Sequence, residues 1–218
     1  MPDHQMDDYW RERAQEYDEI YERDDPGRQA ELAAERARLQ GLVSGKNVLE
    51  MACGTGYWTG VMAATAHSLI ALDNEPEMLR IARAKEFPIR VDFVQADMFA
   101  APVRKESFDV VALGFWFSHQ PRQELDRLFD LLVRPLRPGG LIWMIDNNPP
   151  AEGPQQHTVG RDEQGNNFKR RFLHDGRDYV ILKNYFERHE LERIFWPRFR
   201  IESLIFGHRY WSVVLSAK

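Results

Sequence analysis

Residues 48–56 decide the fold, and they read VLEMACGTG. An apolar run ends in Glu50 and passes into a glycine-containing turn, and a helical pattern follows over Trp58–Ala66. Gly54 and Gly56 allow positive φ angles and close approach of the backbone to a ligand. The start of the next helix adds N–H groups and partial positive charge, which suit an anionic group. The stretch therefore predicts a strand, a ligand-binding turn and a helix.

Strand and helix patterns alternate around this unit, which predicts an α/β, Rossmann-like fold with a mostly parallel sheet and helices on both faces. The expected strands are Asn47–Met51, Ser68–Leu72, Val91–Val94, Phe108–Leu113, Gly140–Ile145, Arg200–Phe206 and Tyr210–Leu215, seven in all. The expected helices between them are Trp58–Ala66, Pro76–Lys85, Arg122–Val133 and Glu187–Phe195.

Two segments stand apart from this alternation. Tyr9–Arg23 and Gln29–Gln40 have helical patterns, the second stopped at Gly41, and the residues before Asp8 are expected to be loose. We interpret residues 1–41 as an N-terminal helical lid and residues 42–218 as the binding domain. Within the latter, residues 147–185 are expected to form a cap insertion, with a long loop over 147–165 and a β-hairpin that turns at residues 174–177.

Composition excludes several classes of protein. The chain has 218 residues, 43% of them hydrophobic, which suits one filled core. A net charge of −5 disfavours a general nucleic-acid binder, and the basic run at residues 169–171 is expected at a solvated strand edge. The single Cys53 excludes an intrachain disulfide and is expected to be buried. A polar N-terminus and the lack of a long apolar run predict a cytoplasmic protein without a membrane span.

Two more carboxylates follow predicted strands. Asp73 ends the second strand and Asp97 follows the third. Because parallel strands share one carboxyl edge, we expect Glu50, Asp73 and Asp97 to line a common cleft. A carboxylate at Asp73 can accept both ribose hydroxyls of a nucleoside. Asp97 could meet an adenine amino group, with Met98 packed on the ring.

Together these residues resemble the class I S-adenosylmethionine (SAM)-dependent methyltransferases. Residues 50–56 resemble the first motif of that family, and Asp73 and Asp97 its ribose and adenine acids. Residues 108–119 resemble its fourth motif, and residues 136–140 the turn before its fifth strand. The resemblance covers roughly residues 47–146 and implies an antiparallel last strand in the sheet. Ala52 departs from the pattern, since the family usually has glycine there, and we expect a slightly altered turn.

The resemblance also implies a set of cofactor-binding residues. A tyrosine in the N-terminal helix contacts the SAM carboxylate in small-molecule members, which points to Tyr17. The residues expected to bind SAM and its product S-adenosylhomocysteine are Tyr17, Glu50, Ala52, Gly54, Gly56, Asp73, Asn74, Met78, Asp97, Met98 and Gly114. No metal site is expected.

The methyl acceptor is expected beside residues 114–119. His119 is the candidate general base because an unperturbed histidine titrates near neutrality, although a histidine here can simply cap a turn. The candidate substrate-binding residues are Tyr21, Phe115, Trp116 and Tyr210, each of which could instead pack in the core. Tyr9, Trp10, Tyr17 and Tyr21 form either a packed helix stripe or a lid over SAM. Polar cap residues could also contact the acceptor or form an exposed strand face; they are Arg170, Arg171, His174, Arg177, Lys183 and Tyr185.

The leading hypothesis is methyl transfer from SAM to oxygen or nitrogen of a small molecule. A protein or RNA acceptor, a SAM-binding module without methylation, and a nicotinamide dehydrogenase are the alternatives. Against RNA stand the net charge and the sequence at residues 114–117, which lacks the Asn/Asp-Pro-Pro-aromatic motif of exocyclic-amino methyltransferases. The identity of the acceptor and the oligomeric state stay open.

Overall fold

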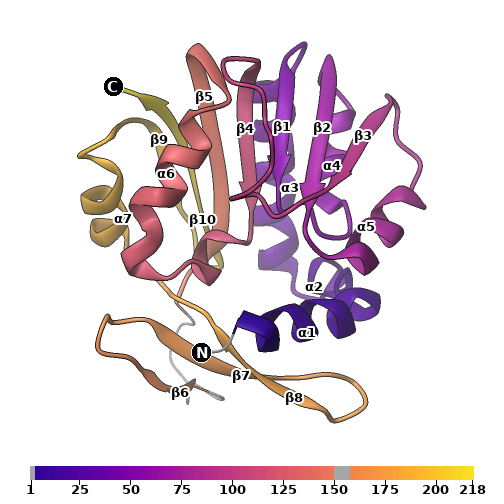
Figure 1. Cartoon of the computed structure of the whole chain (residues 1–218), viewed down its shortest axis with the longest axis vertical. Coiled ribbons are helices and arrows are strands. Elements are labelled where there is room, and N and C mark those ends of the chain that lie inside the picture. The colour runs from indigo at the N-terminus through magenta and orange to yellow at the C-terminus, as the bar shows by residue number, and fades with distance from the viewer. Residues whose placement is uncertain (1–2, 150–157) are drawn as a thin grey trace.

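The computed structural model describes residues 3–149 and 158–218, with side chains from residue 6 onward. Its centre is a seven-stranded sheet in the order β3-β2-β1-β4-β5-β10-β9 (Figure 1). The strands are β1 Asn47–Met51, β2 Ser68–Asp73, β3 Val91–Gln95, β4 Phe108–Gly114, β5 Leu136–Asn147, β9 Phe199–Phe206 and β10 Tyr210–Ala217. β10 is antiparallel to both neighbours, whereas β1 to β5 pair in parallel. The predicted fold class is confirmed.

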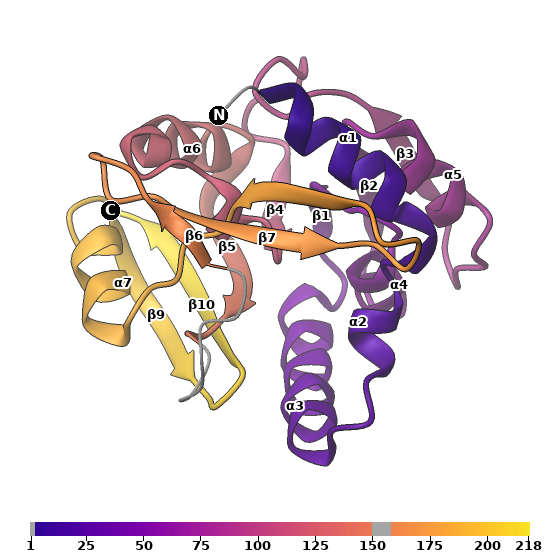
Figure 2. The same ribbon diagram turned by 90° about the horizontal axis from the view of Figure 1, so that it is seen from below.

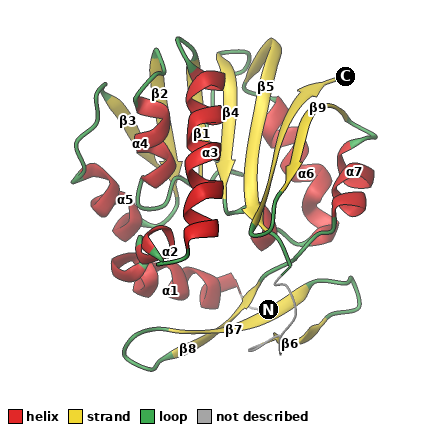
Figure 3. Ribbon diagram, turned by 180° about the vertical axis from the view of Figure 1, so that it is seen from behind, coloured by secondary structure: helices red, strands yellow, loops and turns green. Residues whose placement is uncertain are grey.

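Helices cover both faces of the sheet (Figures 1 and 3). One face carries α3 Pro26–Val43, α4 Tyr57–Ala63 and α5 Pro76–Arg83, and the other carries α6 Leu125–Val133 and α7 Arg188–Phe195. Because central parallel strands are covered on both sides, neighbouring residues of β1 such as Val48 and Leu49 are both fully buried.

The N-terminal prediction needs three corrections. The expected helix over Tyr9–Arg23 is divided into α1 Asp3–Arg13, the short 3-10 helix η1 Ala14–Glu16 and α2 Glu19–Glu22. α1 begins inside the segment expected to be loose, since Met6 packs with Tyr9 against the cap. α3 continues through Gly41 to Val43, because Leu39 and Val43 are buried in the core and hold its last turns. The lid boundary at residue 41 stays a prediction. α3 packs with α4 on a face of the sheet, whereas α1 and α2 lie beyond its carboxyl edge, on the side of the cap (Figure 1).

The cap is a three-stranded antiparallel sheet in the order β6-β7-β8. Its strands are β6 Thr158–Arg161, β7 Asn167–Phe172 and β8 Asp178–Leu182. The predicted hairpin is present as β7 and β8. The predicted loop over 147–165 contains β6 in addition, and residues 150–157 of it lie outside the described residues. The basic run at residues 169–171 lies on the central strand β7, so its prediction as a strand edge was wrong.

Two smaller features complete the fold. The proline-glycine-glycine segment expected as a turn belongs to β5, which begins at Leu136 and has an irregular register opposite β4. Cys53 is buried, as expected. Among the described residues, no helix has the length and apolar character needed to cross a membrane.

Seen from below, α1 and the hairpin lie side by side across the carboxyl ends of the sheet strands (Figure 2). The site is formed between these two elements and the sheet edge.

Candidate active site

A cavity of about 780 Å³ lies at the carboxyl edge of β1 to β4. Its core wall consists mostly of residues expected from the sequence: Ala52, Gly54, Asp73, Asn74, Met78, Asp97, Met98, Gly114, Phe115, Trp116 and His119. α1 contributes Met6, Asp7 and Trp10, and Tyr17 follows η1. The cap contributes Asp162, Asn166, Phe168 and Leu182. The structure therefore brings nearly all of the predicted cofactor residues to one cavity.

The glycine turn has three residues in the left-handed region. The φ angles of Ala52, Gly54 and Gly56 are 53°, 55° and 85°. Ala52 adopts the left-handed conformation itself, at a cost of roughly 1–2 kcal/mol, and the slightly altered turn stays a prediction. Gly56 does not line the cavity. It faces α5 instead, where an added Cβ would lie 3.2 Å from the Cβ of Ala82.

Asp73 is the best-positioned acid of the cavity. One carboxylate oxygen accepts the backbone N–H of Gly54 at 2.7 Å and the other accepts that of Glu75 at 2.9 Å. Burial raises the pKa of Asp73, while these N–H groups oppose the rise. Each oxygen keeps a second lone pair, so the carboxylate can still accept hydroxyl groups.

Glu50 lies behind the turn and not in the cavity wall. Its side chain is 2% exposed and accepts a hydrogen bond from the Thr59 hydroxyl at 2.5 Å. Burial raises the pKa of Glu50 to about 8. The expectation that Glu50, Asp73 and Asp97 line one cleft therefore holds for the two aspartates only.

The N-terminal helices dock directly on the glycine turn. Asp18 accepts a hydrogen bond from the Thr55 hydroxyl and forms an ion pair with Lys85 at 2.6 Å. The ring of Tyr17 lies beside Gly54, where an added Cβ would be 3.8 Å from its Cε1. Tyr17 is thus at the predicted place, next to the turn.

Two of the predicted substrate residues lie outside the cavity. Tyr21 stacks on Tyr57 with ring centroids 3.6 Å apart, and Tyr210 packs edge-on against Phe115 at 5.3 Å. Both tyrosines are buried behind the wall that Phe115 and Trp116 form. The structure supports their alternative reading as core residues.

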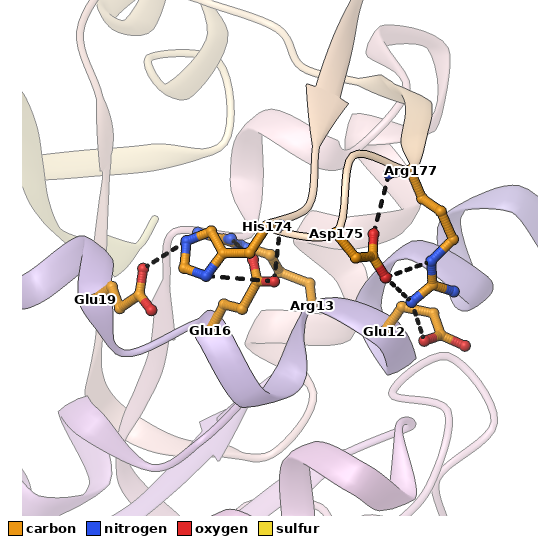
Figure 4. Close-up of polar contacts among 7 residues, drawn as sticks. All are labelled: Glu12, Arg13, Glu16, Glu19, His174, Asp175 and Arg177. Carbon is orange, nitrogen blue, oxygen red and sulfur yellow. Dashed lines mark hydrogen bonds and ion pairs between the residues drawn. The ribbon is translucent and has the colours of Figure 1, made fainter.

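The cap is fastened to the N-terminal helices by charged side chains at the hairpin turn (Figure 4). Arg177 contacts Glu12 at 2.9 Å, and the backbone N–H of His174 donates to Glu16 at 2.9 Å. His174 also lies 3.1 Å from Glu19. These cap residues, together with Arg170 on Asp178, pair with carboxylates of the chain and not with the cavity. We call the set Glu12, Glu16, Glu19, His174 and Arg177 the clasp.

His119 lines the cavity but lacks the property expected of it. Its Nδ1 lies 2.7 Å from the Leu182 carbonyl oxygen, and its ring meets Trp10 edge-on at 4.9 Å. Burial and the nearby Lys183 lower the pKa of His119 to about 3. A base that titrates near neutrality is therefore absent at this position.

Several lining residues were not found from the sequence. Asp162, Asn166, Phe168 and Leu182 come from the cap, and no local pattern shows that this distant segment folds over the sheet edge. The hairpin turn at residues 174–177 indicated that a cap exists, but not which of its residues reach the cavity.

Comparisons with known proteins agree with this geometry. Residues 48–140 match the family model described as "Methyltransferase domain". The solved structures titled "DhpI-SAM-HEP complex" and "DhpI-SAH complex structure" are similar, with TM-scores of 0.79 and 0.75 and identities of 25% and 26%. Each alignment covers 98% of this chain and 96% of the other.

The chain is thus similar to SAM-dependent methyltransferases in the sequence of residues 48–140 and to the SAM- and SAH-bound structures in fold over nearly its whole length. Among curated proteins, the demethylmenaquinone methyltransferase of Lactococcus lactis subsp. lactis (strain IL1403) is 32% identical over 124 residues. That match covers 54% of this chain and 48% of the relative, so the chain spans about half the length of the curated relatives it matches. A similar fold also appears in the PH0226 protein from Pyrococcus horikoshii OT3, with a TM-score of 0.72 at 18% identity, over 93% of this chain and 99% of the other.

Proposed function

We propose that the protein is a SAM-dependent methyltransferase that transfers the methyl group to oxygen or nitrogen of a small molecule. The observation that carries this proposal is the cavity of about 780 Å³, lined by the family's cofactor positions and partly covered by α1 and the cap. Its volume lies within the range of small-molecule and cofactor sites.

The residues of the cavity fit SAM in shape and charge. Asp73 has free lone pairs for the ribose hydroxyls, and Asp97 lies further along the edge for the adenine amino group. Met78 and Met98 offer apolar surface for the purine, and the turn at Gly54 with Tyr17 receives the methionine part. The carboxylates also favour a cofactor that carries a positive sulfonium. Bound SAM would supply an electrophilic methyl group at this site.

The chain's own contribution to catalysis is to hold the acceptor in line and to exclude water. Orientation of this kind is worth about 7–11 kcal/mol in well-ordered reactions. Phe115 and Trp116 form an aromatic wall that can stabilise a cation. Phe115 adopts a φ of 56°, a strained conformation for a bulky residue, and such strain is typical of ligand sites.

A small acceptor is favoured over a macromolecule because α1 and the cap partly cover the cavity. The clasp ties these two elements together, and a folded protein or RNA would have to separate them. The name of a similar curated protein points the same way, since demethylmenaquinone is a small molecule.

Calorimetric titration with SAM and S-adenosylhomocysteine tests the proposal. The wild type should bind both, and Asp73→Asn should weaken binding by about 10- to 150-fold, because charge-assisted hydrogen bonds contribute roughly 1.5–3 kcal/mol. Asp92→Asn is the matched control, since Asp92 is an exposed acid on β3 that pairs with Arg90. Equal affinity in wild type and Asp73→Asn, or no binding by the wild type, would contradict the proposal. If the wild type binds SAM as expected, mass spectrometry of molecules that co-purify with it would identify the methyl acceptor.

A further inference from the structure

Three buried polar side chains meet beside His119, where the cap joins the core. Lys183, in the segment after β8, donates from Nζ to Asp146 Oδ1 at 3.0 Å and to Ser118 Oγ at 2.6 Å. The three residues are 3%, 1% and 1% exposed, respectively. Burying an ion pair is costly unless its geometry and hydrogen bonds are good. None of the three belongs to the cofactor positions, so they need a separate explanation.

Asp146, at the end of β5, organises this group. Its oxygens accept the backbone N–H groups of Ser118 at 2.8 Å and Asn147 at 2.7 Å, and the Ser118 hydroxyl at 2.9 Å. Burial alone would raise the pKa of Asp146, but Lys183, His119 and these N–H groups lower it. Burial lowers the pKa of Lys183, and Asp146 opposes that effect. The group therefore joins β5, the segment after β8 and the 3-10 helix η2 Phe117–His119.

The residues on either side of Lys183 hold His119 and its neighbour. The N–H of Asn184 donates to the Ser118 carbonyl at 2.7 Å. The Leu182 carbonyl oxygen lies 2.7 Å from Nδ1 of His119. Because a carbonyl oxygen only accepts hydrogen bonds, Nδ1 must carry the proton. In the neutral ring, Nε2 is then the unprotonated nitrogen.

His119 stays neutral in this environment. Burial has the largest effect on its pKa, and Lys183 and, more weakly, Arg171 on β7 lower it further, whereas Asp146 and the Leu182 carbonyl raise it; the resulting pKa is about 3. Among the described residues Nε2 has no hydrogen-bond partner, and the ring lines the cavity. Nε2 is thus available as a hydrogen-bond acceptor toward a bound molecule.

We propose that Lys183 is a positioning residue for His119. Together with Ser118 and Asp146 it fixes the Leu182 carbonyl, so that His119 presents Nε2 as a hydrogen-bond acceptor to the O–H or N–H group of the methyl acceptor. This proposal rests on the proposed methyltransferase function. It narrows the substrate to molecules that carry a hydrogen on or beside the methylated atom.

Nitrogen-15 NMR of histidine-labelled protein tests the positioning directly, without any acceptor. In the wild type, His119 should show one neutral tautomer, protonated at Nδ1, from about pH 5 to 8. Lys183→Met should raise the pKa of His119 and give a mixture of tautomers, because it removes a positive neighbour and releases the Leu182 carbonyl. Asp146→Asn removes a charge that raises this pKa, so His119 should stay neutral throughout. A merely loosened structure would instead raise the pKa in both variants.

Lys169→Met is the matched control, since Lys169 lies on β7 and its ammonium contacts the Tyr185 hydroxyl, at 3.3 Å. It should leave the His119 tautomer unchanged. If Lys183→Met does not fold, the double variant Lys183→Met/Asp146→Asn leaves no unpaired buried charge and should also show mixed tautomers. An unaltered tautomer in the folded Lys183 variant, or a wild-type His119 protonated at Nε2, would overturn the proposal. SAM titration of the same samples separates this outcome from failure of the proposed function, because SAM should bind to all of them.

Discussion

At the scale of single residues, Ala52 carries the most informative backbone conformation. Alanine occupies a left-handed position that glycine adopts freely, and the turn is otherwise kept by Gly54 and Gly56. The site therefore tolerates the departure from the family pattern at a local cost in stability.

Ala52→Gly should stabilise the protein by roughly 0.5–1 kcal/mol, since relief of left-handed strain outweighs the greater freedom of unfolded glycine. Chemical denaturation measures the change. Ala34→Gly is the control, because Ala34 is an exposed residue inside α3 and glycine there should destabilise by about 1 kcal/mol. Equal destabilisation by both substitutions would contradict the left-handed strain assigned to Ala52.

Glu50 gives a prediction about pH. Because burial raises the pKa of Glu50 to about 8, from its ordinary value of 4.5, the folded state holds a proton that the unfolded state releases between these values. Stability from this group is therefore complete below the unfolded pKa and is lost as the pH rises through the folded pKa. Asp73, whose pKa is also raised, acts in the same direction.

Glu50→Gln should flatten the dependence of unfolding free energy on pH between about 5 and 8, because the amide cannot ionise. Denaturation of both proteins across this range measures the slope. Parallel curves for wild type and variant would show that Glu50 does not titrate as described.

At the scale of elements, the clasp joins the N-terminal helices to the hairpin turn of the cap, and residues of α1 and the cap line the cavity. Its ion pairs are largely exposed, and such pairs contribute about 0.2–1 kcal/mol each. We expect them to influence ligand retention more than folding.

Arg177→Glu should weaken SAM binding by up to about 5-fold, since it places a second negative charge beside Glu12, where the N-terminal helices meet the cap. The exchange Glu12→Arg/Arg177→Glu should restore part of the affinity. Arg90→Glu, in an exposed pair on the far edge of the sheet, should have no effect. Calorimetry at low and high salt measures these differences, and an unchanged affinity in Arg177→Glu would remove the clasp from ligand binding.

Elements with apolar runs were predictable, and those without were not. The central strands β1, β2 and β4 begin and end close to the predicted residues, because buried parallel strands are nearly continuous apolar segments. β6 was missed because all four of its residues are exposed and carry no apolar period. α3 passes Gly41, because burial of Leu39 and Val43 outweighs the weak helix propensity of one glycine.

At the scale of the whole molecule, the sheet edge was predictable and the cover over it was not. Asp73 and Asp97 reach the cavity because parallel strands share their carboxyl edge. Leu182 and Asn166 reach it only through contacts between distant segments. The low pKa of His119 has the same origin, since it depends on burial beneath the cap and on Lys183.

The central claim is that SAM binds in the cavity between the glycine turn and Asp97. A crystal structure with S-adenosylhomocysteine tests it most directly. We expect the ribose hydroxyls on the Asp73 carboxylate, the adenine beside Asp97 and Met98, and the amino acid part between Gly54 and Tyr17. Ligand density elsewhere, or an empty cavity at saturating ligand, would contradict the claim.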